Sequence, residues 1–207
     1  MIEAVIFDAD GVLVCPQRIW SQQLEHHYHL DSRAVAEFIF IGEFQNCLVG
    51  QADLKEVLPP VLEQLNWTRG VEVFVLEWLE CEYTVDTALL ERITQIRASG
   101  VPCYLATNQE RYRTAYLERE MGLGVALDGI FSSSTLGFRK PSLEYYHAVQ
   151  NQLELEGSEI LFWDDTLKNV EAAYALNWNA ELYTSLEGFD EQMQNLGLLE
   201  SVFKPFS

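Results

Sequence analysis

Short apolar runs that end in polar residues recur along the chain, and they constrain its fold more than any other feature. The runs are Ala4 to Phe7, Pro102 to Ala106, Gly129 to Ser132, Glu159 to Trp163 and Ala180 to Tyr183. Segments of helical periodicity, such as Leu143 to Gln152, separate the later runs. Strands that alternate with helices pair in parallel. The sequence therefore predicts an α/β fold with a parallel sheet, whose ligands gather beyond the carboxyl ends of the strands.

One long segment breaks this alternation. From about Ile19 to Leu90 the strand-like runs largely disappear, and apolar residues recur at helical spacing, as in Leu54, Val57 and Leu58. A chain of 207 residues exceeds the usual size of one domain but is too short for two large ones. We therefore expect one core domain with a smaller helical insertion.

The charge balance is strongly acidic, with 13 lysine and arginine residues against 32 aspartate and glutamate residues and a net charge of -19. Such a surface repels phosphate backbones and anionic lipid, so we expect neither a nucleic-acid nor a membrane partner. A site for phosphate in this chain would need local cations or a bound metal to reverse the sign of the field.

The cysteines and the amino-terminal sequence indicate the cellular compartment in which we expect the protein. Cys15, Cys47, Cys81 and Cys103 are far apart and include no CxxC pair, so we interpret them as reduced thiols. The opening MIEAVIFDADG enters a strand directly, without a basic region followed by a long apolar one. We therefore expect a cytoplasmic location. No feature of the sequence predicts an oligomeric state.

The first candidate site residues are Asp8 and Asp10, two carboxylates that follow the first strand and precede Gly11. A carboxylate oxygen can attack phosphorus once a divalent cation reduces the charge repulsion, and a second carboxyl group can donate and accept the proton. The alternative is a solvated Asp-x-Asp turn. Taken alone, the pair does not decide between a catalytic site and a turn.

Two further segments offer groups for phosphoryl oxygens. Thr107 and Asn108 end the second strand with a hydroxyl and backbone N–H groups that suit an anion, although both residue types also favour a helix cap. Lys140 precedes Pro141 and supplies a cation in a chain with few. We predict that Thr107, Asn108 and Lys140 bind substrate; the alternative for Lys140 is a solvated surface position.

The last strand end carries Asp164 and Asp165 side by side. Adjacent carboxylates repel each other unless a cation lies between them. Oxygen ligands without cysteine or histidine favour Mg²⁺ over zinc or copper. The pair therefore predicts a magnesium site, while a helix cap explains only one of the two.

These four segments, in this order, resemble the four motifs of the haloacid dehalogenase superfamily. The resemblance implies a Rossmann-like core with Asp8 as nucleophile and metal ligand. It implies that Asp10 is the acid/base and binds Mg²⁺ through its backbone carbonyl, that Thr107 and Lys140 hold the phosphoryl group, and that Asp164 or Asp165 anchors the metal. An aspartate at position 10 resembles the phosphatases more than the founding dehalogenases, which have an aromatic residue there.

The resemblance also implies a domain division and a substrate class. It assigns residues 1–14 and 85–207 to the core and residues 15–84 to a small helical cap domain that selects substrates. The segment from Phe162 to Asp165 is similar to a subgroup that includes sugar-phosphate phosphatases. We expect a phosphatase for a small phosphorylated metabolite, with a sugar phosphate as one class. A phosphomutase of the β-phosphoglucomutase type and a noncatalytic phospholigand-binding protein remain alternatives.

Candidates for specificity are found in and around the cap. Gly42 precedes Glu43, Phe44 and Gln45, which we place in a cap loop directed toward the site, while Glu110 and Arg111 follow the second motif. We expect the tryptophans at positions 20, 67 and 78 to fill the core of the cap.

Overall fold

A five-stranded parallel sheet forms the centre of the part of the chain that the structure describes. The structure is a computed structural model, and it describes residues 1–16 and 18–200. The strands are β1 (Ala4–Phe7), β2 (Cys103–Thr107), β3 (Gly129–Ser132), β4 (Ile160–Asp164) and β5 (Asn179–Leu182). Their order is β3-β2-β1-β4-β5, and every neighbouring pair is parallel. The predicted Rossmann-like α/β fold is confirmed.

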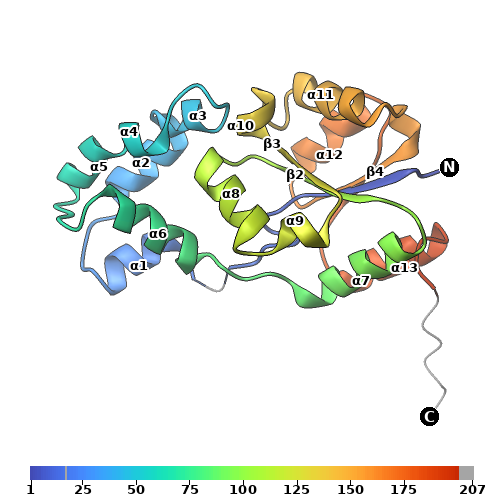
Figure 1. The fold of residues 1–207 in the computed structure, drawn as a ribbon, viewed down its shortest axis with the longest axis horizontal. Helices are drawn as coiled ribbons and strands as arrows, with labels where there is room; N and C mark the ends of the chain where they lie inside the picture. Colours follow the sequence, from blue (N-terminus) through green and yellow to red (C-terminus); the bar gives the residue numbers. More distant parts are fainter. Residues whose placement is uncertain (17, 201–207) are drawn as a thin grey trace, which may run out of the picture.

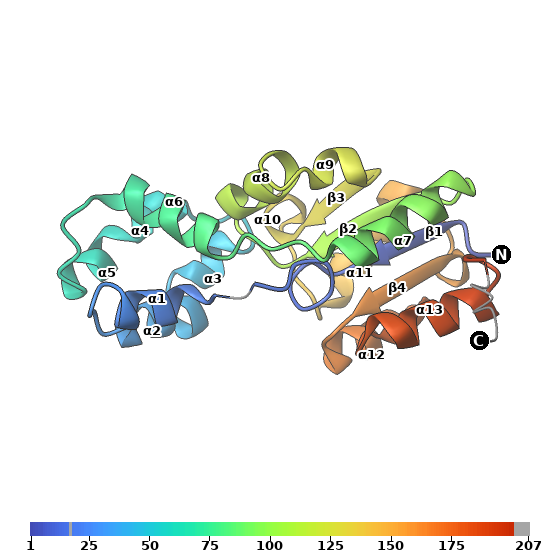
Figure 2. The ribbon, with the colours of Figure 1, turned by 90° about the horizontal axis from the view of Figure 1, so that it is seen from below.

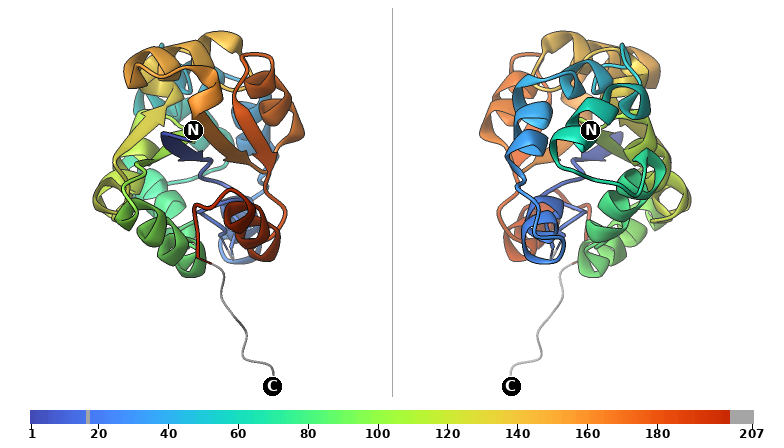
Figure 3. Two further views of the ribbon diagram at one scale, coloured as in Figure 1. Left: turned by 90° about the vertical axis from the view of Figure 1, so that its right-hand side faces the viewer. Right: turned by 90° about the vertical axis from the view of Figure 1, so that its left-hand side faces the viewer.

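Helices cover both faces of the sheet, as Figures 1 and 3 show. On one face lie α7 (Thr87–Ala98), α8 (Arg111–Arg119), α9 (Leu123–Ala126) and α13 (Leu186–Asn195). On the other lie α11 (Leu143–Leu153) and α12 (Leu167–Tyr174). The short α10 (Ser133–Leu136) and the 3-10 turn Gly157–Glu159 complete the core. The result is a three-layer arrangement with the sheet in the middle.

Alternation along β1 explains why both faces are apolar. Val5 and Phe7 point to the α7 and α13 side, whereas Ile6 points to the α11 and α12 side. All three are fully buried. A strand covered by helices on both faces is a nearly continuous apolar run, which is why β1 contains no polar residue and the first one, Asp8, follows its end.

The segment between β1 and α7 folds into a helical cap. Its helices are short: α1 (Trp20–His26), α2 (Arg33–Ile41), α3 (Phe44–Cys47), α4 (Leu54–Val57), α5 (Pro59–Gln64) and α6 (Val71–Cys81). They enclose a hydrophobic cluster of their own, in which the ring of Trp20 packs against Trp67 and Phe74. Trp20 and Trp67 are buried in the cap core as expected, whereas Trp78 is partly buried and packs against that core. Among the described residues, no helix has both the length and the apolar character needed to cross a membrane.

Two chain segments connect the cap to the core, and they pair with each other. Val14 forms an antiparallel bridge with Val85, and the N–H of Cys15 donates to the carbonyl of Thr84 at 3.0 Å. Figure 2 shows both connections leaving the end of the sheet toward which the strand arrows point. This paired neck lies next to the boundaries expected from the sequence, after residue 14 and before residue 85, and the division into two domains stays a prediction. The cap therefore lies over the carboxyl ends of the strands.

Candidate active site

The carboxyl ends of three adjacent strands bring polar side chains together beneath the cap. Asp8 follows β1 directly, Thr107 ends β2 and Asp164 ends β4. The exposed fraction is 8% for Asp8, 1% for Thr107 and 0% for Asp164. The strand order reverses at β1, the position at which open parallel sheets bind ligands. The structure thus brings these three predicted site residues together, and their roles stay predictions.

Lys140 supplies a positive charge between two carboxylates of this site. Its side-chain ammonium lies 2.8 Å from Asp8 Oδ1 and 2.6 Å from Asp164 Oδ2, and the residue is only 3% exposed. Burial lowers the pKa of Lys140, but attraction to the two carboxylates outweighs burial and raises it above its ordinary value. Burial raises the pKa of Asp8 to about 7, against the opposing effect of Lys140. Lys140 is thus a buried cation and not a solvated surface residue.

Asp164 is held in place by neighbours from its own loop. The side-chain amide of Asn169 lies 3.0 Å from each Asp164 carboxylate oxygen, and the N–H of Thr166 donates to Oδ1 at 2.8 Å. Asn169 is buried in the first turn of α12. These bonds and the bond from Lys140 fix the carboxylate rigidly at the strand end.

Three carboxylates form a cluster that fits a divalent cation. Oxygen atoms of Asp8, Asp164 and Asp165 lie within 4.8 Å of one another. When all three carboxyl groups are ionised, Lys140 supplies one positive charge against three negative charges, which leaves an excess of two. Mg²⁺ binds oxygen ligands and carries the charge that balances this excess. The donor set therefore fits the predicted metal.

The turn after β1 leaves room for the third member of that cluster. Gly11 has a φ of +82°, and a Cβ atom built on it would lie 2.0 Å from Asp165 Oδ2. Only a residue without a side chain lets the turn approach the carboxylate so closely. Gly11 therefore allows both the positive φ of the turn and the close approach of Asp165.

Asp10 occupies a different environment from Asp8. Its side chain is 52% exposed and is not part of the acidic cluster. The side-chain amide of Gln109 donates to its Oδ2, and the Arg113 guanidinium lies 3.7 Å from its Oδ1. A half-exposed carboxyl group held at one side of the site is suited to proton transfer. Neither Gln109 nor Arg113 is predicted from the sequence, in which Gln109 is marked only by its position directly after the second motif.

Asn108 makes its contacts with the loop that carries Lys140. Its side-chain Nδ2 donates to the Lys140 carbonyl at 2.9 Å, and its Oδ1 accepts from the Lys140 N–H at 2.8 Å. This reciprocal pair ties the end of β2 to the loop before α11. The side chain is therefore placed to hold the lysine backbone, while the predicted substrate contact of Asn108 stays a prediction.

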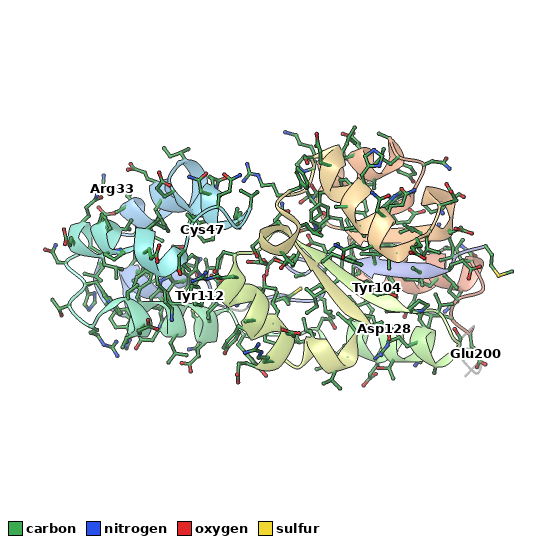
Figure 4. All side chains as sticks on the ribbon, turned by 45° about the horizontal axis from the view of Figure 1, so that its top comes forward. Arg33, Cys47, Tyr104, Tyr112, Asp128 and Glu200 are labelled. Atoms are coloured by element: carbon green, nitrogen blue, oxygen red, sulfur yellow. The ribbon has the colours of Figure 1, made fainter. Side chains whose placement is uncertain are left out.

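The cap contacts the core close to the site. Phe44 and Gln45 lie in the short helix α3 and not in the predicted loop. Phe44 and Glu110 border a pocket next to Asp10, and Gln45 accepts a hydrogen bond from Arg139. The Tyr112 hydroxyl donates to Asp53 of the cap at 3.0 Å. Figure 4 shows Tyr112 at the end of α8 nearest the cap, far from Asp128 and Glu200. Cap residues thus lie next to the core residues at the carboxyl ends of the strands.

Comparison with known families agrees with this geometry. The sequence profile of the haloacid dehalogenase-like hydrolases matches residues 2–177. The chain therefore belongs to the haloacid dehalogenase-like hydrolase family, and the resemblance inferred from the four motifs is confirmed.

Two curated relatives are phosphatases. A sesquiterpene phosphatase of Aspergillus oryzae is 34% identical over 94 residues, which cover 44% of this chain and 46% of the relative. A phosphoglycolate phosphatase of Pectobacterium atrosepticum is 23% identical over 179 residues, or 84% of this chain and 76% of the relative. The match thus spans about half the length of the fungal relative and most of the bacterial one.

Solved structures show the same fold at low identity. A family hydrolase from Porphyromonas gingivalis superposes with a TM-score of 0.79 at 17% identity, covering 95% of this chain and 98% of the other. A family enzyme from Bacteroides thetaiotaomicron, in complex with magnesium and inorganic phosphate, gives a TM-score of 0.77 at 16% identity over 93% of this chain and 99% of the other.

Proposed function

We propose that this protein is a Mg²⁺-dependent phosphatase that hydrolyses a small phosphorylated metabolite through an aspartyl phosphate on Asp8. The observation that carries the proposal is the buried group in which the Lys140 ammonium bridges Asp8 and Asp164 at 2.8 and 2.6 Å. The phosphatases among the relatives support the reaction type. The related structure that holds magnesium and phosphate supports the metal.

The reaction consists of two transfers that use Asp8 and Asp10. In the first, an Asp8 carboxylate oxygen forms a bond to phosphorus, the bond from phosphorus to the alcohol oxygen breaks, and Asp10 gives its proton to that oxygen. In the second, a water oxygen attacks phosphorus, Asp10 takes a proton from the water, and the bond to Asp8 breaks. The products are the alcohol and inorganic phosphate, and both carboxyl groups return to their starting states.

The acidic cluster would hold the metal through Asp8, Asp164 and Asp165, together with the predicted backbone carbonyl of Asp10. A bound Mg²⁺ supplies charge neutralisation between the carboxylate nucleophile and the phosphoryl oxygens. Two neighbouring residues position these metal ligands without binding the metal themselves. Asn169 fixes Asp164 by a hydrogen bond, and Gly11 leaves space for Asp165.

The remaining predicted residues hold the transferred group. Lys140 provides a positive charge for a phosphoryl oxygen next to Asp8, and such fixed charges stabilise the transition state of phosphoryl transfer. Thr107 supplies a hydroxyl at the end of the neighbouring strand. Asn108 keeps the Lys140 backbone in position and can offer its own N–H to the same anion.

The test is phosphate release from a panel of phosphorylated sugars, nucleotides and simple phosphoesters by wild type, Asp8→Asn and a control, Asp31→Asn, in Mg²⁺ or in EDTA. Asp31 is an exposed cap residue paired with Arg33, so its conversion to asparagine makes the same chemical change away from the site. We expect metal-dependent release that Asp8→Asn reduces by about 10⁴-fold or more, as when an enzyme loses its nucleophile, and that the control retains.

Other outcomes separate the alternatives. Acid quenching with a ³²P-labelled ester should leave label on wild type but not on Asp8→Asn. Transfer of the label to a second hydroxyl of the substrate, without free phosphate, would indicate a phosphomutase. No release and no label from any compound, with binding that survives Asp8→Asn, would indicate a noncatalytic phospholigand-binding protein.

A further inference from the structure

A pocket opens beside Asp10, on the side of the site that the leaving group must occupy. It lies between the cap and the core, and its cavity volume is about 40 Å³ within about 350 Å³ of empty space that includes the open mouth. Asp10 is the proposed proton donor to the leaving oxygen, so the group attached to that oxygen extends into the space that Asp10 borders. The residues that line the pocket therefore determine which alcohols can bind there as leaving groups.

The cap contributes an apolar wall to this pocket. The lining side chains are Phe44 from α3, Leu54 from α4, and Val75, Trp78 and Leu79 from α6. Leu54 and Val75 are almost fully buried, and the rings of Phe44 and Trp78 pack with centroids 5.8 Å apart. Apolar walls of this kind favour ligands that bring hydrocarbon out of water.

The polar groups of the lining already have protein partners. Gln109 donates to Asp10, and the Glu110 carboxylate accepts the backbone N–H groups of Tyr112 and Arg113. The Arg113 guanidinium donates to the carbonyls of Leu79 and Glu82 at 3.4 and 3.1 Å. A hydroxyl group of a sugar would have to compete with these bonds or stay unpaired, and an unpaired buried hydroxyl is unfavourable.

The charges of the lining also exclude a second anionic group. With Asp10 protonated as the proton donor, Glu82 and Glu110 still supply two carboxyl groups against one guanidinium from Arg113. A carboxylate or a second phosphate on the leaving group would meet this excess of like charge. A neutral leaving group meets no such repulsion.

From this lining we infer that the substrate is the phosphate monoester of a neutral, hydrocarbon-rich alcohol and not of a sugar, a nucleoside or a carboxylated alcohol. The inference rests on the proposed phosphatase function. It narrows the small phosphorylated metabolite of that proposal to one class of leaving group, which the α3, α4 and α6 side chains select.

The experiment compares two esters that share a skeleton and differ in polarity. Cyclohexylmethyl phosphate and glucose 6-phosphate both carry a phosphorylated methylene on a six-membered ring, with hydroxyl groups and a ring oxygen on the second only. We expect wild type with Mg²⁺ to favour the carbocycle in kcat/KM by about 100-fold, the discrimination that an apolar site shows against an added hydroxyl. Equal rates or a preference for the sugar would overturn the inference.

Two positions on α6 provide the matched variants. Leu79 lines the pocket, whereas Leu76 is 51% exposed on the same helix and lies outside it. Leu79→Gln should reduce the preference about tenfold, mainly through KM for the carbocyclic ester, and Leu76→Gln should leave it unchanged. Val75→Thr, which keeps the side-chain shape, provides a second change of the lining should Leu79→Gln fold poorly. A preference unaffected by either lining variant would overturn the inference.

The result also separates this inference from the proposed function. If other phosphomonoesters release phosphate in an Asp8-dependent manner but the carbocycle shows no advantage, only the leaving-group assignment fails. If no ester of any class releases phosphate with Mg²⁺, the proposed function fails and this inference fails with it.

Discussion

Lys140 lies between two carboxylates that would otherwise repel each other, and this single residue defines the balance of charge at the site. It neutralises part of the negative charge of Asp8 and Asp164, while the acidic cluster as a whole stays negative without a divalent cation. Functional sites often retain unfavourable charge that substitution relieves at the expense of activity. The effect of this unfavourable charge on the free energy of unfolding can be measured by replacing Asp8.

We predict that, in EDTA, Asp8→Asn is more stable than wild type by a margin that grows as the pH rises. The folded pKa of Asp8 is about 7 and its ordinary value is 3.8, so the unfolded chain releases this proton first. Wild type therefore loses free energy of unfolding as the pH rises through that interval, and the loss is complete above it. Asparagine has no proton to release at this position.

Urea unfolding at about pH 4.5, 6 and 8 gives the difference between the two proteins. The control is Asp31→Asn, because the Asp31 pKa is lowered by its hydrogen bonds from Arg33, so removing that carboxylate gives no gain at high pH. A constant or shrinking margin for Asp8→Asn would show that burial of Asp8 does not oppose its ionisation.

At the scale of elements, the loop after β1 and the loop after β4 depend on each other through Gly11 and Asp165. We predict that Gly11→Ala raises the Mg²⁺ concentration needed for half-maximal activity by about 10- to 100-fold, the range found when the support of a metal ligand is lost. The added Cβ would lie 2.0 Å from Asp165 Oδ2, so the carboxylate must move away from the cluster.

The matched control for this prediction is Gly122→Ala. Gly122 has a φ of +74° and no atom within 4 Å of an added Cβ, so it carries the same backbone strain without the contact. Both variants should lose roughly 1 kcal/mol of stability to the left-handed conformation. An unchanged Mg²⁺ requirement in Gly11→Ala, or an equal rise in Gly122→Ala, would show that the close approach to Asp165 is irrelevant.

The core elements were predictable from sequence because their periodicity is strong. The strand predicted from Gly129 to Ser132 is β3, and the helix predicted from Leu143 to Gln152 differs from α11 by one residue. Parallel strands also place their carboxyl ends at one edge, which is why Asp8 and Asp164 could be paired in advance. Deviations include element ends, such as the start of β2 at Cys103 and not at Pro102, and the short helices α9 and α10, which the sequence does not predict.

The cap and its contacts were less predictable for a physical reason. Helices of four residues, such as α3 and α4, contain about one turn and give no measurable periodicity. The contact of Gln109 and Arg113 with Asp10 depends on how α8 packs beneath α6, and sequence spacing does not encode that packing. The leaving-group pocket is assembled from these same elements, so only the structure reveals it.

At the scale of the whole molecule, a chain of net charge -19 must attract an anionic phosphoester. The cation that favours the substrate acts locally, because Lys140 is buried beside Asp8, whereas the negative charge of the remaining surface acts at longer range. Added salt screens long-range repulsion more than contacts between buried groups, since the Debye length is about 10 Å at 0.1 M. The two contributions can therefore be separated by ionic strength.

We predict that kcat/KM for a phosphomonoester rises several-fold between about 20 and 300 mM NaCl at saturating Mg²⁺, because screening weakens the repulsion between the acidic surface and the approaching anion. Steady-state kinetics over this range measures the effect, with sucrose of equal osmolarity and sodium acetate in place of chloride as controls for viscosity and for a specific ion. A fall in kcat/KM with salt would mean that the local cations around Lys140, and not the net charge, control the approach of the substrate.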